Sequence, residues 1–180
     1  GWSFAHDPFF MGISPLPEYW DEMNQKFYTK YAGLNQCHMK WGEDVYLKGK
    51  IVGFTGREWP MELKTKTDRF GGTKQVLPWT KLTNSPIQGT GNDLMAIARI
   101  LMHQRLTNEK IPGKLVGTVH DSIIIDTPDP QAVSELFYRS FDDIPANVER
   151  LFKYKMSVQF PCEVKAGMNL LEMEKIPRAA

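Results

Sequence analysis

The segment from Lys114 to Pro128, KLVGTVHDSIIIDTP, constrains the fold more than any other part of the chain. Two runs rich in β-branched residues flank a His-Asp pair, and such runs predict two strands joined by a tight turn. We therefore expect His120 and Asp121 at or near the tip of a hairpin. Rigid strands would hold the carboxylate there facing solvent or a cleft, which suits a metal ligand. Asp is also a common turn residue, so a purely structural role fits this segment equally well.

The composition fits one domain or a large piece of one. The 180 residues are 42% hydrophobic and 24% charged, which is enough apolar material for a core. The net charge of +1 gives no overall attraction to nucleic acid. There is no apolar run of about 18 residues and no visible signal peptide, so we expect a cytoplasmic protein without a membrane partner. Cys37 and Cys162 lack CxxC spacing and are expected to be free thiols.

The remaining pattern alternates helices with short strands. Apolar spacing predicts helices over residues 17–33, 34–47, 84–106, 129–144 and 146–155. Strands are expected over 50–55 and 59–63, joined at a Gly56-Arg57 turn, and over 157–165. This order indicates an α+β fold in which helices pack on one face of an antiparallel sheet.

A basic segment, KTKTDRFGGTKQ at residues 64–75, is expected to form a surface loop. Lys and Arg outnumber the acids between residues 40 and 81, and such a local excess can hold a phosphate backbone. A solvated loop with no ligand is the alternative.

The helix expected over Asn84–Leu106 has an apolar face and a separate polar face that includes Gln88. Gly89 and Gly91 lie in its first turns, although glycine is unfavourable in a helix. They indicate close approach of a ligand or another backbone, or simply packing against a strand. Gln88 is either a surface amide or a residue that contacts the flat edge of a ligand.

Together, several segments resemble the C-terminal palm of family A DNA polymerases, the DNA polymerase I type, and the phage-encoded members look most similar. The two most specific segments are NSPIQGTGNDL at Asn84–Leu94 and TVHD at Thr118–Asp121. Further similarity lies in FYTKYAG at Phe27–Gly33, in Gly56-Arg57, and in Gly167–Asn169. The resemblance implies that residues 17–180 form the C-terminal palm subdomain of a right-hand polymerase fold, with an antiparallel palm sheet. Residues 1–16 would be a remnant of the fingers or of the fingers–palm connection.

The resemblance also implies a site for nucleotidyl transfer. Asp121 would be one of two aspartates that bind a pair of Mg²⁺ ions about 4 Å apart, which activate the primer 3′-hydroxyl and stabilise the pyrophosphate leaving group. Mg²⁺ prefers one or two carboxylates together with phosphates and waters. His120 would contact the backbone at the primer terminus.

The DNA contacts implied by the resemblance involve other residues. Gln88 and Asn84 would face the minor groove beside the nascent base pair, where the acceptors are the same for every correct pair. Arg57 and Lys81 would hold the phosphate backbone. The partners would be primer-template DNA and a deoxynucleoside triphosphate, in the cytoplasm of a bacterial or phage-infected cell.

Three positions differ from the family pattern. Ser122 follows the His-Asp pair where Glu is usual, and His-Asp-Ser is familiar from single-subunit RNA polymerases, which share this palm. Thr80 lies where a basic residue is common, although Lys81 is adjacent. Leu170 follows Gly167–Asn169 where Trp is usual. An RNA polymerase palm and a non-catalytic DNA-binding remnant are therefore alternatives to a DNA polymerase.

The family's other catalytic aspartate and the fingers helix lie N-terminal to the matched region. None of the other acids is a convincing replacement: Asp7 is expected to be structural, and Asp93 and Asp126 are expected on the surface. One carboxylate cannot hold two ions, so we expect this chain to be inactive alone. Its activity would require an N-terminal polymerase fragment, present as a separate chain, that shares the two Mg²⁺ ions.

Overall fold

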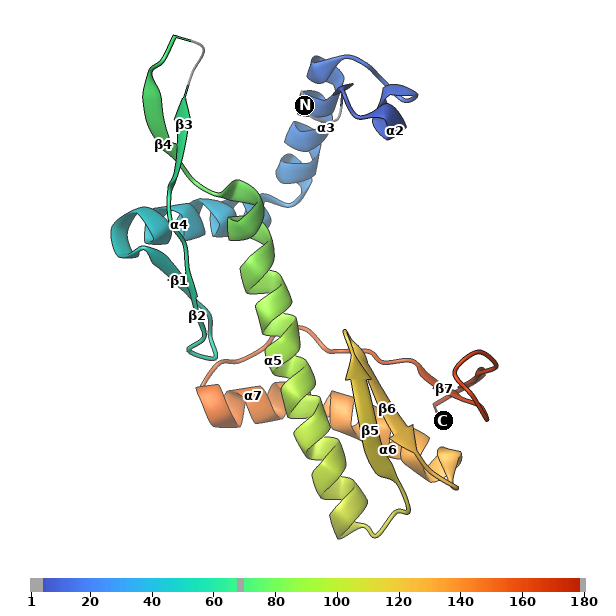
Figure 1. Ribbon diagram of the computed structural model, residues 1–180. Coiled ribbons are helices and arrows are strands. Elements are labelled where there is room, and N and C mark those ends of the chain that lie inside the picture. Colours follow the sequence, from blue (N-terminus) through green and yellow to red (C-terminus); the bar gives the residue numbers. More distant parts are fainter. Residues whose placement is uncertain (1–4, 68–69, 179–180) are drawn as a thin grey trace. The chain divides into compact units, whose positions relative to one another are not determined.

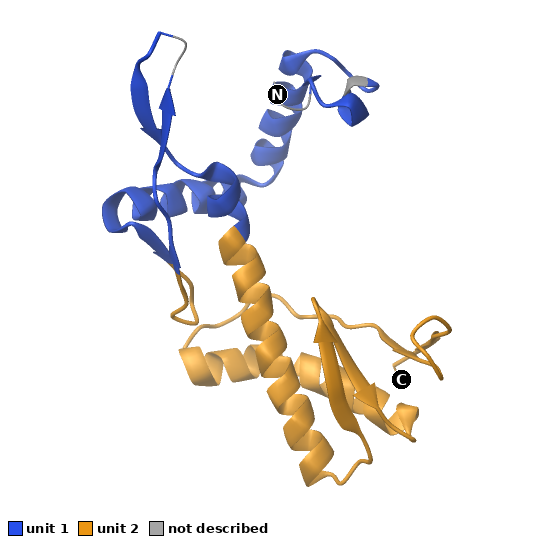
Figure 2. Cartoon of the chain, viewed as in Figure 1, with its two compact units in different colours: residues 1–51, 59–84 blue, residues 52–58, 85–180 orange. Residues whose placement is uncertain are grey.

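The computed structural model describes residues 5–67 and 70–178. The chain divides into two compact units (Figure 2). Residues 1–51 and 59–84 form the first unit, and residues 52–58 and 85–180 form the second. The boundary falls within one long helix and within the first hairpin, so both elements contribute residues to each unit.

Three helices open the first unit: α2 at Pro8–Met11, α3 at Pro17–Lys30 and α4 at Ala32–Lys48. The Asp7 carboxylate accepts a hydrogen bond from the Phe9 backbone N–H at 2.9 Å and caps α2, so the structural role predicted for this residue is confirmed. Helix α4 ends at Gly49, whose φ of 68° is the left-handed conformation that glycine adopts easily. The two helices predicted between Pro17 and Leu47 are therefore present.

Two hairpins follow in the chain (Figure 1). Strand β1, Lys50–Val52, pairs with β2, Glu58–Pro60, as predicted. Strand β3, Lys64–Thr67, pairs antiparallel with β4, Thr73–Val76. The expectation that residues 64–75 form a loop is therefore wrong, because threonines at alternate positions favour strands and outweigh the charge of the segment. The first unit has a buried cluster of Val45, Ile51, Met61 and Leu82.

Helix α5 spans Trp79–Asn108 and begins five residues earlier than expected. Pro86, predicted near the helix start, lies inside the helix and is buried. Proline lacks a backbone N–H, so it removes one intrahelical hydrogen bond at that point.

In the second unit, strands β5 (Lys114–Val119) and β6 (Ser122–Asp126) pair antiparallel, as predicted. Helices α6 (Pro130–Asp142) and α7 (Ile144–Phe152) follow. Both were predicted, but α7 begins two residues earlier and ends three residues earlier than the expected 146–155, with Pro145 in its first turn. The half-buried side chains of Leu115, Ile123 and Ile125 pack against buried residues of α5 and α6. These helix residues are Met102, Leu106, Val133 and Leu136.

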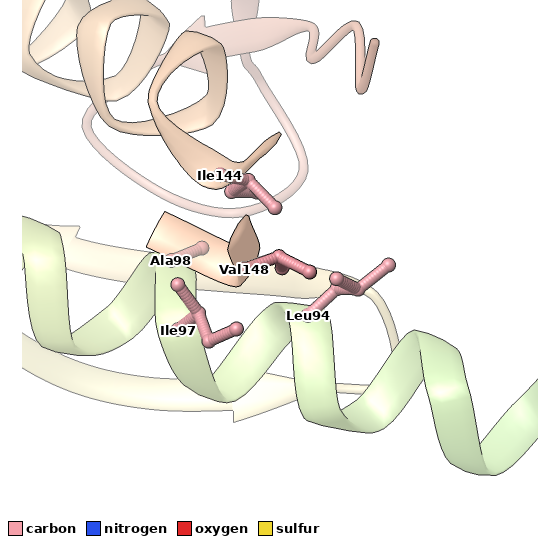
Figure 3. Packing of buried hydrophobic residues seen from close by; sticks show 5 residues of the cluster. All are labelled: Leu94, Ile97, Ala98, Ile144 and Val148. Carbon is pink, nitrogen blue, oxygen red and sulfur yellow. The ribbon is translucent and has the colours of Figure 1, made fainter. Parts of the chain in front are cut away.

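A second buried cluster joins α5 to α7 (Figure 3). Leu94, Ile97 and Ala98 of α5 meet Ile144 and Val148 of α7. The side chain of Phe54, from the loop between β1 and β2, packs against the same cluster. Its ring stacks on Tyr154 with centroids 4.6 Å apart.

The C-terminal segment contains β7, Val164–Ala166, paired with β8, Glu174–Ile176. The strand expected over residues 157–165 is wrong except at its last two positions. Phe160 packs on the α5–α7 cluster from an irregular segment, so the apolar alternation there reflects packing rather than strand pairing. Cys37 and Cys162 are free thiols, as predicted.

The α+β fold class is confirmed, and helices pack on one face of the β5–β6 pair. Within the described ranges the strands form four two-stranded antiparallel sheets. No helix in this part of the chain is both long and apolar enough to cross a bilayer.

We predict that Leu136→Ala lowers the free energy of unfolding by about 2–5 kcal/mol, because it leaves a cavity between α5, α6 and the β5–β6 pair. Leu136 is 0% exposed, whereas Leu171 is 96% exposed and offers a matched control. Denaturant unfolding measures both variants. Equal effects of Leu136→Ala and Leu171→Ala would contradict the assigned core.

Candidate functional site

The turn between β5 and β6 consists of His120 and Asp121 alone. The strand register pairs Val119 with Ser122, so no other residue lies in the turn. The hairpin is closed at its far end by the pair of Lys114 and Asp126, and it contains a bulge between Leu115 and Gly117. The prediction that the His-Asp pair lies at a hairpin tip is confirmed.

His120 adopts a left-handed backbone conformation with φ of 53°. For a residue with a Cβ this conformation costs about 1–2 kcal/mol relative to the right-handed region. Residues kept in such conformations concentrate at functional sites, because the surrounding structure must offset their cost. A glycine would remove the cost. Lys110 and Lys153 adopt the same conformation with φ of 54° and 58°, so the backbone alone assigns no use to the His120 side chain.

The Asp121 carboxylate is exposed and makes no hydrogen bond or ion pair with another residue in the described ranges. Its oxygens are the type of ligand that Mg²⁺ prefers, so the residue fits one position in a magnesium site. In the same part of the chain, no three His, Cys, Asp or Glu side chains gather closely enough to hold a metal. The described residues alone therefore do not form a metal site at Asp121.

The other candidate acids have different positions. Asp126 is exposed, as expected, but it lies at the opposite end of β6 from the turn. At ~3.4 Å per residue, the strand separates Ser122 from Asp126 by about 14 Å. The carboxylates of Asp121, in the turn, and Asp126, at the far end of β6, therefore cannot bind the same metal ion. The expectation that Asp93 lies on the surface is wrong, because its side chain is only 14% exposed.

Asp93 of α5 forms an ion pair with Arg57, which directly precedes β2. The Arg57 Nε donates to both carboxylate oxygens at 3.0 and 3.1 Å, its Nη2 donates to Oδ1, and the Thr55 hydroxyl donates to Oδ2 at 2.7 Å. The hydrogen bonds from Arg57 lower the pKa of Asp93, against the opposing effect of burial, and the one from Thr55 lowers it further. The Asp93 carboxylate therefore holds the loop between β1 and β2 through Arg57 and Thr55. This role was not predicted from the sequence.

Part of the polar face of α5 is open. Gln88 and Asn92 are exposed, and a Cβ at Gly91 would meet no atom within 4 Å. Within the described structure, Gly91 therefore does not pack against a strand, so strand packing does not explain why glycine occupies this position. Arg99 donates from Nη1 to the Thr118 hydroxyl at 3.4 Å, and this contact links α5 to β5 two residues before His120.

Further along the same helix, a shallow hollow is lined by Ala96, Arg99, Ile100, His103 and Gln104.

Asn84 and Lys81 belong to the first unit, and both are exposed. The Lys81 ammonium donates to the Pro60 carbonyl at 3.2 Å.

These observations agree with the comparison to known sequences. The family model described as DNA polymerase family A matches residues 18–172, and the chain belongs to this family. DNA polymerase I of Aquifex aeolicus is 27% identical over 139 residues, which cover 71% of this chain and 22% of that protein. The resemblance inferred from the sequence motifs is confirmed.

Two further relatives show the range of the similarity. DNA polymerase I of Caldicellulosiruptor bescii is 32% identical over 91 residues, covering 49% of this chain and 10% of that protein. The DNA polymerase of Bacillus phage SP01 is 44% identical over 45 residues, covering 25% of this chain and 5% of that protein. The chain thus spans 22% or less of the length of these relatives.

We predict that Asp93→Asn lowers the denaturant midpoint of unfolding near neutral pH, because it removes the charge that Arg57 holds. The folded-state pKa of Asp93 lies below its ordinary value of 3.8, so this stabilisation is present above that pH and is lost as pH falls through the folded-state pKa. Unfolding measured from pH 7 downward should show the two curves converging at acidic pH. A pH-independent difference would assign the effect to packing instead.

His120→Gly is expected to give a more stable protein than His120→Ala, by about 1 kcal/mol, because glycine alone adopts the left-handed conformation without a steric penalty. Denaturant unfolding of both variants provides the measurement. Equal stability would show that the left-handed conformation is not maintained in solution. Ser122→Ala and Ser122→Gly, at the adjacent strand position, provide the control pair.

Proposed function

We propose that this chain is the C-terminal palm portion of a DNA-directed DNA polymerase, with primer-template DNA and deoxynucleoside triphosphates as its substrates. In this proposal residues 17–180 are the palm, and residues 1–16 belong to the connection with the fingers. The main support is the placement of an exposed carboxylate, Asp121, in a two-residue turn held by strands that pack on two helices. Membership of the polymerase family supports the same conclusion.

In this proposal Asp121 holds magnesium for a two-metal transfer reaction. When bound, the two Mg²⁺ ions lower the barrier by activating the primer 3′-hydroxyl and by neutralising charge on the leaving pyrophosphate. The role of this chain is to hold the Asp121 carboxylate at the tip of the β5–β6 hairpin. The neighbouring His120 imidazole is proposed to contact the sugar–phosphate backbone at the primer end.

Two sets of side chains are proposed to bind the DNA. Gln88 and Asn84, both exposed and four residues apart on α5, offer amide donors to minor-groove acceptors that do not depend on sequence. Lys81 and Arg57 are proposed to bind phosphates. The Nη1 of Arg57 is proposed to donate to a phosphate, because Nε and Nη2 donate to Asp93 and the side chain remains 49% exposed.

We further propose that a separate N-terminal polymerase fragment supplies the second metal-binding carboxylate. The support for this proposal is that Asp93 is engaged by Arg57, that Asp126 lies at the far end of its strand, and that Asp7 caps a helix. Among the described residues, Asp121 belongs to no group of three or more His, Cys, Asp or Glu side chains that could hold a metal ion. A chain with one metal-binding carboxylate should show no polymerase activity alone.

The test is primer extension by this chain co-expressed with an N-terminal family A fragment that carries the fingers. Asp121→Asn should lower the rate by a factor on the order of 10²–10³, because metal coordination contributes several kcal/mol to the transition state. Asp126→Asn, on the same hairpin, should leave the rate within about twofold. Co-purification with the fragment should be unchanged in both variants.

Other results would overturn the proposal. Extension by the isolated chain would disprove the shared site, and full activity of Asp121→Asn would disprove the metal role. A preference for ribonucleotides would favour the RNA polymerase palm suggested by Ser122. Binding of DNA without incorporation in the complex would favour a non-catalytic palm.

A further inference from the structure

The β3–β4 hairpin has an unusual distribution of charge. The register places Lys66 directly opposite Lys74, and Lys64 lies two positions away from Lys66 on the same strand. Side chains two residues apart share one face of a strand, so the three lysines lie on one face of the hairpin. The opposite face carries Thr65, Thr67, Thr73 and Gln75, all uncharged.

The neutral face stabilises the hairpin. Gln75 donates from Nε2 to the Thr65 hydroxyl at 3.1 Å across the two strands, and Thr67 pairs with Thr73. Such cross-strand pairs each contribute roughly 0.2–1 kcal/mol, whereas like charges placed directly opposite destabilise a sheet. The lysine face therefore opposes folding of the hairpin, unless an anion neutralises it.

The lysines have no anion of their own in the described structure. None of the three ammonium groups forms an ion pair with a carboxylate in the described ranges, and all three side chains are exposed. Residues 64–75 contain four cations and one acid, a net charge of +3, in a chain whose total is only +1. The excess positive charge of the protein is thus concentrated in this hairpin.

Two residues that flank the hairpin anchor its base to the first unit. Leu63 and Leu77, which flank it in sequence, pack on the buried cluster of the first unit. Every side chain of β3 is exposed, and in β4 only Val76 is partly buried. Two-stranded hairpins are marginally stable in water, so one without a buried face must depend on its base or on a ligand.

We propose that the lysine face of the β3–β4 hairpin binds the phosphodiester backbone of duplex DNA, without reading its sequence. A two-stranded ribbon is narrow enough to follow a DNA groove, and a row of ammonium groups is complementary to the row of phosphates. The inference rests on the proposed function only for the identity of the polyanion as DNA. It adds a contact that is separate from Asp121 and from the polar face of α5.

The test is the salt dependence of duplex DNA binding by the whole chain, measured by fluorescence anisotropy with a labelled duplex between about 50 and 200 mM salt. Lys64→Gln, Lys66→Gln and Lys74→Gln together should reduce the slope of log K against log salt by about 3, one per lost phosphate contact. At the lowest salt concentration the Kd should rise at least about tenfold.

Two further variants, one triple and one single, test whether an effect on DNA binding comes from the total charge of the protein or from the stability of the hairpin. Lys26→Gln, Lys110→Gln and Lys155→Gln together remove the same charge from other exposed lysines and should leave the slope unchanged. Lys66→Glu places opposite charges across the strands, so it should stabilise the hairpin and yet weaken binding. An unfolding curve for each variant verifies that it folds.

The possible results distinguish this inference from the proposed function. If wild type binds DNA and the hairpin triple variant binds with the same slope, the hairpin contact is wrong while the polymerase proposal stands. If both triple variants lose binding equally, the attraction is general and the hairpin is again not the site. If the hairpin triple alone loses binding but Asp121→Asn stays active in the complex, the hairpin contact holds and the metal role fails. If wild type does not bind duplex DNA, the hairpin contact is wrong, and primer extension by the complex with the N-terminal fragment still decides the proposed function.

Discussion

The packing of Leu115, Ile123 and Ile125 against α5 and α6 is the interaction on which the candidate site depends. A two-stranded hairpin alone is marginally stable, and full burial of an aliphatic side chain contributes about 1.5–3 kcal/mol as an upper value. With these three side chains half-buried, the strands are fixed by the helices rather than by their own hydrogen bonds. The turn can then hold His120 in a costly conformation and Asp121 in solvent without loss of the hairpin.

Local sequence signals predicted most of the helices and the central hairpin. Asp129 accepts a hydrogen bond from the Ala132 backbone N–H at 3.1 Å, which is the capping geometry expected before Pro130. The wrong predictions arose where one sequence pattern is compatible with two different structures. Charge in residues 64–75 obscured a strand pattern, and apolar alternation in residues 157–165 came from contacts with the α5–α7 cluster rather than from a pairing strand.

The candidate site was predictable to the extent that it is local. The position of Asp121 follows from two strands and the turn between them, all within fifteen residues of sequence. The pairing of Arg57 with Asp93 joins residues 36 positions apart, so only the folded chain reveals it. This pairing also removes Asp93 as a candidate metal ligand and, within the described ranges, leaves only the Nη1 of Arg57 without a hydrogen bond. Neither consequence follows from the spacing of residues in the sequence.

The brevity of the β5–β6 turn has a consequence for how this segment can evolve. Because side chains along a strand alternate between two faces, inserting or deleting one residue between Val119 and Ser122 would shift the pairing and turn Ile123 and Ile125 away from the helices. The position of Asp121 and the burial of these isoleucines therefore both depend on the length of this turn. We expect divergence at this point of the chain to occur by exchange of residue type, while changes in length accumulate in segments such as 157–163, whose backbone pairs with no strand.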